Sequence, residues 1–287
     1  MSLSTVVTNV ANEAGYTVES NIIVSTETTT KQLRTLANRI NQEMSDAYPW
    51  TSMYASGAIT LVAGQSQYEL PAAFSYYLYE TFWNSSTRWR VIGPMTPQEY
   101  AETQGYGLNT SIYTRFQLRG VSNSQLLIYP TPTAGTAGQT IIFEYIADRS
   151  VRPATWAAGT AYDSGAYTFY NGNYYTTSAG GTSGATAPTH TSGSVSDGGV
   201  TWTYYSGPYK EFLTNSDVSI FNERTLELGV LERFAEIHGL DTIQPRYETQ
   251  LNEDFSRQNP GKLIYAGGYG RGNMFARNNV VVFGTWI

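Results

Sequence analysis

The chain has 287 residues, enough for one large domain or two modest ones with a substantial buried core. Charged residues make up 14% of it, against roughly 25% in ordinary soluble domains, and the net charge of −6 argues against a large basic face for binding nucleic-acid phosphates. Because the chain has no cysteine, disulfides, thiolate nucleophiles and cysteine-ligated zinc are excluded.

Two helices are predicted in the first fifty residues. Apolar residues recur at helical spacing over 3–14, and Gly15 supplies a C-terminal stop. A longer helix is predicted over 30–47, where leucine, alanine, isoleucine and methionine form one apolar stripe. Thr29 and Gln32 have the spacing of a capping box, which predicts that this helix begins beside them.

Residues 50–147 follow a β pattern instead. Short runs such as AITLVA, YYLYETFW, RFQLRG and TIIFEYIA are separated by glycine, serine, asparagine and proline. A small helix is expected over 97–104, with Thr96 as its cap and Glu99 reaching back to that cap. The region is therefore predicted to be antiparallel β structure with one short helix.

Residues 156–206, called the aromatic segment below, differ sharply in composition from the rest of the chain. Asp163 and Asp197 are the charged residues there, whereas ten residues are aromatic and nine are glycine. Dense turn residues and short β-prone runs without helical spacing predict a small all-β unit. Its expected boundaries lie at 148–153 and 206–210.

Helical spacing returns after the aromatic segment. One helix is predicted over 226–237, with Gly239 as its stop. A second is predicted over 243–255, with Asp241 and Gln244 as its cap. Since the strand before the aromatic segment and these helices are expected to belong to one body, the segment is interpreted as an insertion.

The last residues, 265–287, combine a glycine-rich stretch with a β-prone VVVF run. An uncovered run of this kind promotes aggregation, so an extended arm that docks on a neighbour is predicted. Two of its arginines also suggest contact with nucleic acid as an alternative, as in arginine- and glycine-rich segments. The candidate residues for docking on the portal or on a neighbour are Arg271, Phe275, Arg277, Phe283 and Trp286.

The sequence offers little for catalysis. His190 and His238 give no sign of converging on a triad or a metal site. The glutamates around 226–237 are interpreted as a solvated helix face or inter-subunit ion pairs, with a paired acid–base site as the alternative. We therefore expect no enzyme activity, no catalytic residue, no metal and no cofactor. The glutamates concerned are Glu223, Glu227, Glu232 and Glu236.

The rings of the aromatic segment have two interpretations. Flat rings can stack on the apolar faces of sugars while neutral hydroxyl and amide groups bind the sugar hydroxyls. The alternative is that a small β unit with few aliphatic residues uses its rings as a core. The candidate carbohydrate-stacking residues are Trp156, Tyr170, Tyr175 and Trp202.

An ordered set of patterns outside the aromatic segment resembles the head-to-tail connector proteins (adaptor, or head-completion proteins) of tailed bacteriophages. The first is LANRINQEM…YPW, followed by GQSQYELPAAF, WRVIGPMTPQEYAE and LLIYPTPTAG…IIFEYIADR; FNERTLELGVLERFAEIHGL closes the set. The resemblance covers roughly 1–150 and 207–260. It implies an α+β fold, with a helical connector core, an antiparallel β region and an inserted small all-β module. The expected divisions are 1–150, 151–207, 208–264 and 265–287.

The same resemblance implies a virion structural protein at the head–tail junction. Such proteins form a ring, commonly of twelve copies, beneath the portal protein, bind a tail or nozzle protein, and line a passage for DNA without sequence-specific binding. No apolar run approaches a membrane span, and the first residues lack a basic signal region. We therefore expect synthesis in the host cytoplasm and no membrane contact.

The aromatic segment is itself similar to small chitin-binding-type modules. The likeness rests on Trp156, the YTFYNGNYY run and Trp202, and GTSGATAPT…DGGVTWTY also recurs in modules of phage tail and fibre proteins. This likeness keeps two alternatives open. One is a carbohydrate-binding tail or decoration protein that acts through this segment, and the other is a tail-associated glycan hydrolase.

Overall fold

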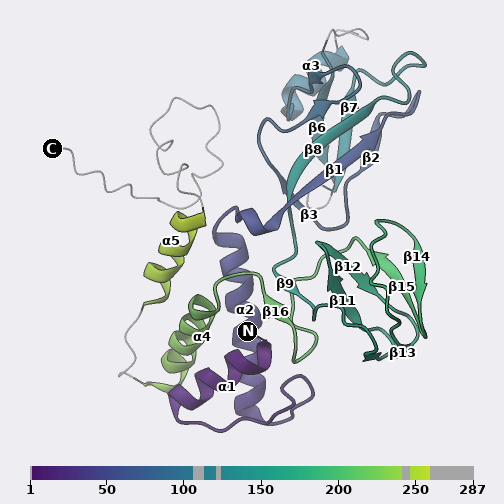
Figure 1. The fold of residues 1–287 in the computed structure, drawn as a ribbon. Coiled ribbons are helices and arrows are strands. Elements are labelled where there is room, and N and C mark those ends of the chain that lie inside the picture. The colour runs from purple at the N-terminus through teal and green to yellow at the C-terminus, as the bar shows by residue number, and fades with distance from the viewer. Residues whose placement is uncertain (1, 106–112, 121–123, 241–245, 259–287) are drawn as a thin grey trace, which may run out of the picture.

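The computed structural model describes residues 2–105, 113–120, 124–240 and 246–258. Figure 1 shows the N-terminal helices packed with the later ones, a β region beyond them, and a further group of strands to one side. We call α1, α2, α4 and α5 the helical body. The described helices are α1 (Leu3–Ala14), α2 (Thr28–Ala47), the 3-10 helix η1 (Thr51–Met53), α3 (Pro97–Gly105), α4 (Glu223–His238) and α5 (Tyr247–Gln258).

The helical body is built around α2. This helix contacts both α1 and α4, and α4 in turn contacts α5. The apolar stripe of α2 is fully buried at Leu33, Ile40 and Met44, as expected for an amphipathic helix. Trp50 closes the end of this core, because its indole N–H donates to the backbone oxygen of Met44 at 2.6 Å. Helices that are distant in sequence therefore share one core.

The helix ends confirm some capping predictions and correct one. Gly15 and Gly239 both adopt the left-handed conformation, with φ of 79° and 65°, and end α1 and α4 as predicted. The capping box predicted at Thr29 is wrong, since α2 begins at Thr28, two residues before the predicted start, and Thr29 lies inside the helix. The hydroxyl of Thr30 donates to the carboxylate of Glu27 instead, the residue that precedes the helix.

The described residues between 54 and 147 form two antiparallel sheets around one core, and we call this part of the chain the two-sheet region. Phe82 stacks on Phe116 and Phe143, with ring centroids 4.1 and 4.8 Å apart, so rings from both sheets meet there. The larger sheet has the order β1-β8-β4-β5, with β3 also paired to β8, and the smaller has the order β2-β7-β6. The strands are β1 (Tyr54–Thr60), β2 (Gln67–Glu69), β3 (Phe74–Tyr77), β4 (Trp83–Asn84), β5 (Trp89–Arg90), β6 (Arg115–Arg119), β7 (Gln125–Tyr129) and β8 (Thr140–Ala147).

The short helix α3 has the cap that the sequence predicts. The backbone N–H of Thr96 donates to the Glu99 carboxylate at 2.8 Å, and the N–H of Glu99 donates to the Thr96 hydroxyl at 3.2 Å. These reciprocal bonds define a capping box and satisfy two backbone donors that the helix itself leaves unpaired.

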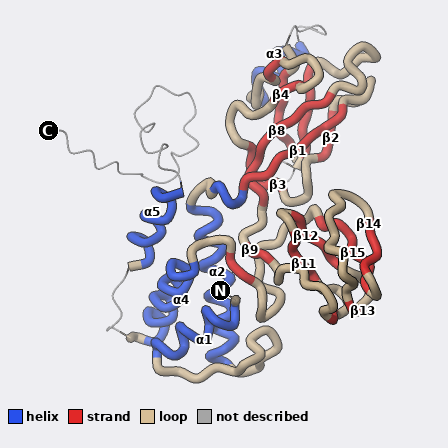
Figure 2. Tube along the Cα trace, in the orientation of Figure 1, coloured by secondary structure: helices blue, strands red, loops and turns tan. Residues whose placement is uncertain are grey.

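The aromatic segment contains strands and turns and no helix. Four strands form a sheet in the order β11-β12-β15-β14, which Figure 2 shows as a separate group of red tube segments. We call it the aromatic sheet. A short pair lies beside it, and another joins the chain before and after the segment. The strands are β9 (Val151–Arg152), β10 (Ala161–Tyr162), β11 (Tyr167–Tyr170), β12 (Asn173–Thr176), β13 (Gly181–Thr182), β14 (Ser194–Asp197), β15 (Val200–Tyr205) and β16 (Val218–Ser219).

Both faces of the aromatic sheet carry packed rings. Tyr174 and its cross-strand partners Phe169 and Tyr205 pack against the core of the helical body. The next residue, Tyr175, faces the opposite way and packs with Trp202 in a separate small core. Because side chains alternate between the two faces of a strand, a sheet that is covered on both faces needs apolar groups at successive positions. This double burial accounts for the density of rings.

Arg149 connects the aromatic sheet to the rest of the chain. Its guanidinium group donates to the backbone oxygens of Tyr205 and Gly207, at 3.0 and 3.1 Å, and lies 4.7 Å from the centre of the Tyr174 ring. A cation over a ring face in a partly desolvated site is stabilising. Beside it, β9 pairs with β16, so the chain enters and leaves the segment through neighbouring strands.

Replacing Tyr174 with phenylalanine is expected to change how stability depends on pH. Burial raises the pKa of the Tyr174 hydroxyl to about 12, and Arg149 and Arg152 partly oppose the shift. In the unfolded chain the Tyr174 hydroxyl ionises near pH 10. The free energy of unfolding therefore falls by about 2–3 kcal/mol between pH 10 and 12 through this group. The variant loses the bond from the hydroxyl to Val151, worth about 1 kcal/mol, but is spared that alkaline loss.

Urea unfolding at pH 7 to 12 measures this difference. The variant is expected to be less stable than the parent protein at pH 7 and more stable at pH 12, with the order reversing above pH 10. A gap that stays constant up to pH 12 would contradict the prediction. Tyr79→Phe, which alters a half-exposed ring, serves as the matched control and is expected to follow the parent protein.

The architecture agrees with the predicted α+β class, since helices and antiparallel sheets are both present. None of the helices within the described ranges is both long and apolar enough to cross a lipid bilayer. The predicted cap at Asp241 and Gln244 and the arm at 265–287 lie outside the described residues.

Candidate functional site

The glutamates of α4 make structural contacts. Glu227 is nearly buried and accepts a hydrogen bond from the Asn9 amide at 2.7 Å, which links α4 to α1. Glu232 accepts the backbone N–H groups of Arg246 and Tyr247, and so caps the start of α5. These carboxylates position helices, and the contacts that they make do not form a paired acid–base site.

Glu236 belongs to an ion-pair row on the surface of the helical body. The guanidinium group of Arg233 lies 3.1 Å from the Glu236 carboxylate and 3.9 Å from that of Glu43 on α2. Glu43 also pairs with Arg39 one turn earlier, at 3.1 Å. All four side chains are at least one-third exposed, so each pair contributes little to stability. Of the four glutamates predicted on a solvated face, Glu236 lies in this exposed row, whereas the prediction is wrong for Glu227, which is nearly buried.

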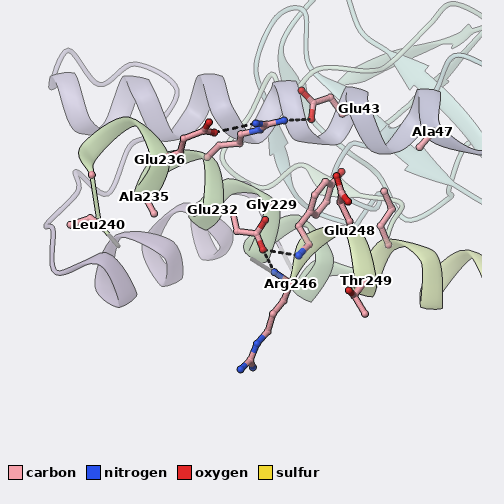
Figure 3. Close-up of a pocket in the computed structure, with 14 residues that line it drawn as sticks. Glu43, Ala47, Gly229, Glu232, Ala235, Glu236, Leu240, Arg246, Glu248 and Thr249 are labelled. Atoms are coloured by element: carbon pink, nitrogen blue, oxygen red, sulfur yellow. Dashed lines mark hydrogen bonds and ion pairs between the residues drawn. The ribbon is translucent and has the colours of Figure 1, made fainter. Parts of the chain in front are cut away.

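A groove of about 970 Å³ lies between α2, α4 and α5 (Figure 3). Gly229 forms part of its wall. A Cβ atom there would lie 2.6 Å from Ile40 and 2.9 Å from the Tyr247 ring, so the packing requires glycine. The groove is lined by Glu43, Ala47, Gly229, Glu232, Arg233, Ala235, Glu236, Gly239, Leu240, Arg246, Tyr247, Glu248, Thr249 and Leu251.

The groove has limited chemical capacity. Burial, and secondarily the charge of Glu43, raises the pKa of the Tyr247 hydroxyl, so this group stays protonated at neutral pH. Arg246 points away from the groove in Figure 3, while Glu232 is already engaged by backbone N–H groups. Across the described ranges, no group of three or more histidine, aspartate, glutamate or cysteine side chains is arranged to hold a metal ion.

The two histidines lie in different parts of the fold, His238 exposed at the end of α4 and His190 half-buried in the aromatic segment. His238 lies against Phe234, with ring centroids 4.3 Å apart, and one ring nitrogen is 3.0 Å from the Gln32 side-chain oxygen. His190 packs on Tyr175 in the aromatic segment, with ring centroids 4.9 Å apart. Each histidine therefore has a local packing role.

The sequence matches the model of a known protein family. The model described as SU10 adaptor protein matches residues 1–179, more than half of the chain. The chain belongs to the SU10 adaptor protein family. This confirms the resemblance to phage head–tail adaptors, and it makes the chain a phage structural protein that contacts other head or tail proteins in the virion.

The match to the SU10 adaptor protein family covers α1, α2, the two-sheet region and the aromatic segment as far as β12. It ends before β15, α4 and α5, although α4 shares its core with α1 and α2. No curated protein matches the chain. The likeness of the aromatic segment to chitin-binding-type modules stays a prediction.

In this SU10 adaptor family member, the predicted carbohydrate-stacking rings differ in burial. Trp202 and Tyr175 are fully buried, so their faces pack against protein. Trp156 and Tyr170 are half-buried and meet edge to face, with centroids 5.9 Å apart. Of these four rings, Trp156 and Tyr170 retain surface that a ligand can reach.

Asp197 is a key residue of the aromatic segment that the sequence reasoning did not identify. Its Oδ2 atom accepts the indole N–H groups of both Trp156 and Trp202, at 3.1 and 3.4 Å, and the residue is nearly buried. A buried tryptophan N–H normally needs an acceptor. The available signal was an isolated aspartate among neutral residues, five positions before Trp202.

The predicted docking arm cannot be placed, because its residues lie outside the described ranges. These residues are Arg271, Phe275, Arg277, Phe283 and Trp286.

Proposed function

We propose that the protein forms a homo-oligomeric ring, of twelve copies as in similar connectors, that joins the portal of a phage capsid to the tail. DNA passes through the ring without sequence-specific binding. The family assignment over residues 1–179 carries this proposal. The mechanism is mechanical, since the protein links two components and keeps the DNA path open.

The charge of the chain supports a passage for DNA. A net charge of −6 and a pI near 5.0 oppose tight binding of phosphates, so DNA can move past the ring without being retained. The exposed ion-pair row of Glu43, Arg233 and Glu236 suits a contact between copies, because exposed charges specify orientation at modest energetic gain.

Mass photometry and negative-stain electron microscopy of the protein mixed with its portal protein test the proposal. The expected result is a ring bound to the portal, with a particle mass that gives the number of copies. A protein that stays monomeric and does not bind the portal protein under these conditions would contradict the proposal. Arg233→Glu, which reverses the centre of the ion-pair row, is expected to weaken assembly, whereas Arg257→Glu on α5 is the matched exposed control.

A carbohydrate-binding role for the aromatic segment is the second candidate, and it is supported by the accessible surface of Trp156 and Tyr170. Deleting 156–206 would also expose the apolar contact with the helical body, so point substitution is the cleaner test. Binding on a glycan array that Tyr170→Ala abolishes while the sheet stays folded would support this role. An array on which the protein binds no glycan would exclude the carbohydrate-binding role.

A further inference from the structure

The outer edge of β1 offers a site for an additional contact. Along its whole length, Tyr54 to Thr60, this strand pairs with β8 on one side. Within the described residues, no strand pairs with its other side. The remaining edge strands in the described ranges are shorter, and several span only two to four residues. β1 is therefore the longest open edge among them.

The direction of the peptide groups shows what this edge offers. The backbone N–H of Leu61, just beyond β1, donates to Gln139 on the β8 side. Because peptide groups alternate in direction along a strand, the N–H groups of Ser56, Ala58 and Thr60 point away from β8. The same alternation turns Val62 outward, and its N–H is satisfied by the Tyr68 hydroxyl at 2.9 Å.

Nothing within β1 protects its edge against pairing. The strand reads YASGAIT, without a charged residue or proline, and its register with β8 is regular. Open edges in soluble proteins normally carry charges, prolines or bulges that prevent another strand from adding. An unprotected edge from Ser56 to Thr60 is suited to accept a strand.

An exposed apolar row leads to this edge. Ala58 on β1 is paired with Ile142 on β8, which is paired in turn with Trp83 on β4. Cross-strand partners share a face of the sheet, and all three residues are exposed on that face. Ala58 is the smallest of the three and lies at the open edge, so an added strand can place a larger apolar side chain beside it.

The sequence beyond the described residues contains a suitable strand. Val280 to Phe283 read VVVF, uncharged and with high β propensity. The last described residue, Gln258, accepts a hydrogen bond from the Thr51 hydroxyl at 3.3 Å, three residues before β1 begins. The chain therefore leaves the described structure close to the start of β1.

The length of the intervening chain favours a second copy as the acceptor. Residues 259–279 include five glycines and, fully extended, span up to about 70 Å. Reaching β1 of the same copy would take only a few residues. We propose that Val280–Phe283 of one copy adds as a strand to the outer edge of β1 in a neighbouring copy. This depends on the proposed function only in requiring that copies lie side by side.

Disulfide trapping tests the pairing directly, because the chain has no cysteine of its own. Full-length Ala58→Cys is mixed with a differently tagged full-length chain that carries one cysteine at position 280, 281, 282 or 283. Mild oxidation is expected to give mixed dimers at alternate tail positions only, since successive side chains of a strand point to opposite faces. Val195→Cys, on the exposed edge strand β14, is the matched control and is expected to give few dimers.

Equal trapping at all four tail positions, equal trapping with Val195→Cys, or no trapping would each overturn the proposal. A chain that carries both cysteines shows whether the tail pairs with β1 of its own copy or of a neighbour. A disulfide within one copy leaves the particle mass unchanged, and that result would also overturn the proposal. These outcomes do not require the portal. A protein that fails to bind the portal but shows alternating trapping would contradict the proposed function and leave this inference standing.

Discussion

Replacing Trp202 with alanine is expected to lower the free energy of unfolding of the aromatic sheet by about 3–5 kcal/mol. The indole is fully buried, meets the Tyr162 ring edge to face at 4.8 Å, and donates its N–H to Asp197. The small core in which it packs has Tyr175 and Val200 as its other buried members.

Amide hydrogen exchange resolves this effect by region. Protection in β12 and β15 is expected to fall by several orders of magnitude, while α2 and α4 keep theirs. Trp89→Ala is the matched control, because that indole is half exposed, and it is expected to change stability by no more than about 0.5 kcal/mol. Unchanged protection in Trp202→Ala would show that the core tolerates the loss. If glycan binding is found, its loss in this variant reports unfolding, so Tyr170→Ala is the informative substitution.

The helices could be predicted from sequence because their signals are local. Gly15 and Gly239 end their helices through a backbone conformation that glycine adopts without strain, and Thr96 with Glu99 forms its cap within four residues. The prediction at Thr29 was wrong because α2 begins after Glu27, which makes no side-chain capping bond, and Thr29 lies inside the helix. Capping-box spacing alone therefore did not decide the first residue of this helix.

The roles of the aromatic rings could not be divided by sequence. In β12, Tyr174 and Tyr175 are adjacent and chemically identical, yet one packs on the helical body and the other in the small core with Trp202. What distinguishes them is the covering of each face by distant parts of the chain, such as Arg149 and Tyr209. The charged helix face was foreseen, but the cap that Glu232 provides for α5 depends on tertiary placement.

Asp217 anchors the connection between the aromatic segment and the helical body. Its side chain is fully buried and accepts the backbone N–H groups of Leu213 and Thr214, at 2.7 and 2.9 Å, and the Thr214 hydroxyl at 2.6 Å. The Tyr209 hydroxyl is a fourth donor, at 3.0 Å, and burial followed by the charge of Asp217 raises the pKa of that tyrosine. The backbone oxygen of Asp217 also accepts the N–H of Leu3, the first residue of α1.

Replacing Asp217 with alanine is therefore expected to lower the free energy of unfolding by roughly 4 kcal/mol. Four donors would lose their acceptor at once, and each buried donor left unpaired costs about 1–3 kcal/mol before water or local rearrangement compensates. Urea unfolding followed by circular dichroism measures the loss, with Ser216→Ala, on the exposed side of the same turn, as the matched control. A loss below about 1 kcal/mol would mean that water replaces the carboxylate, and that the turn does not depend on this buried charge. A large loss would identify the turn as the element that fixes α1 against β16, and with it the junction through which the aromatic segment is attached.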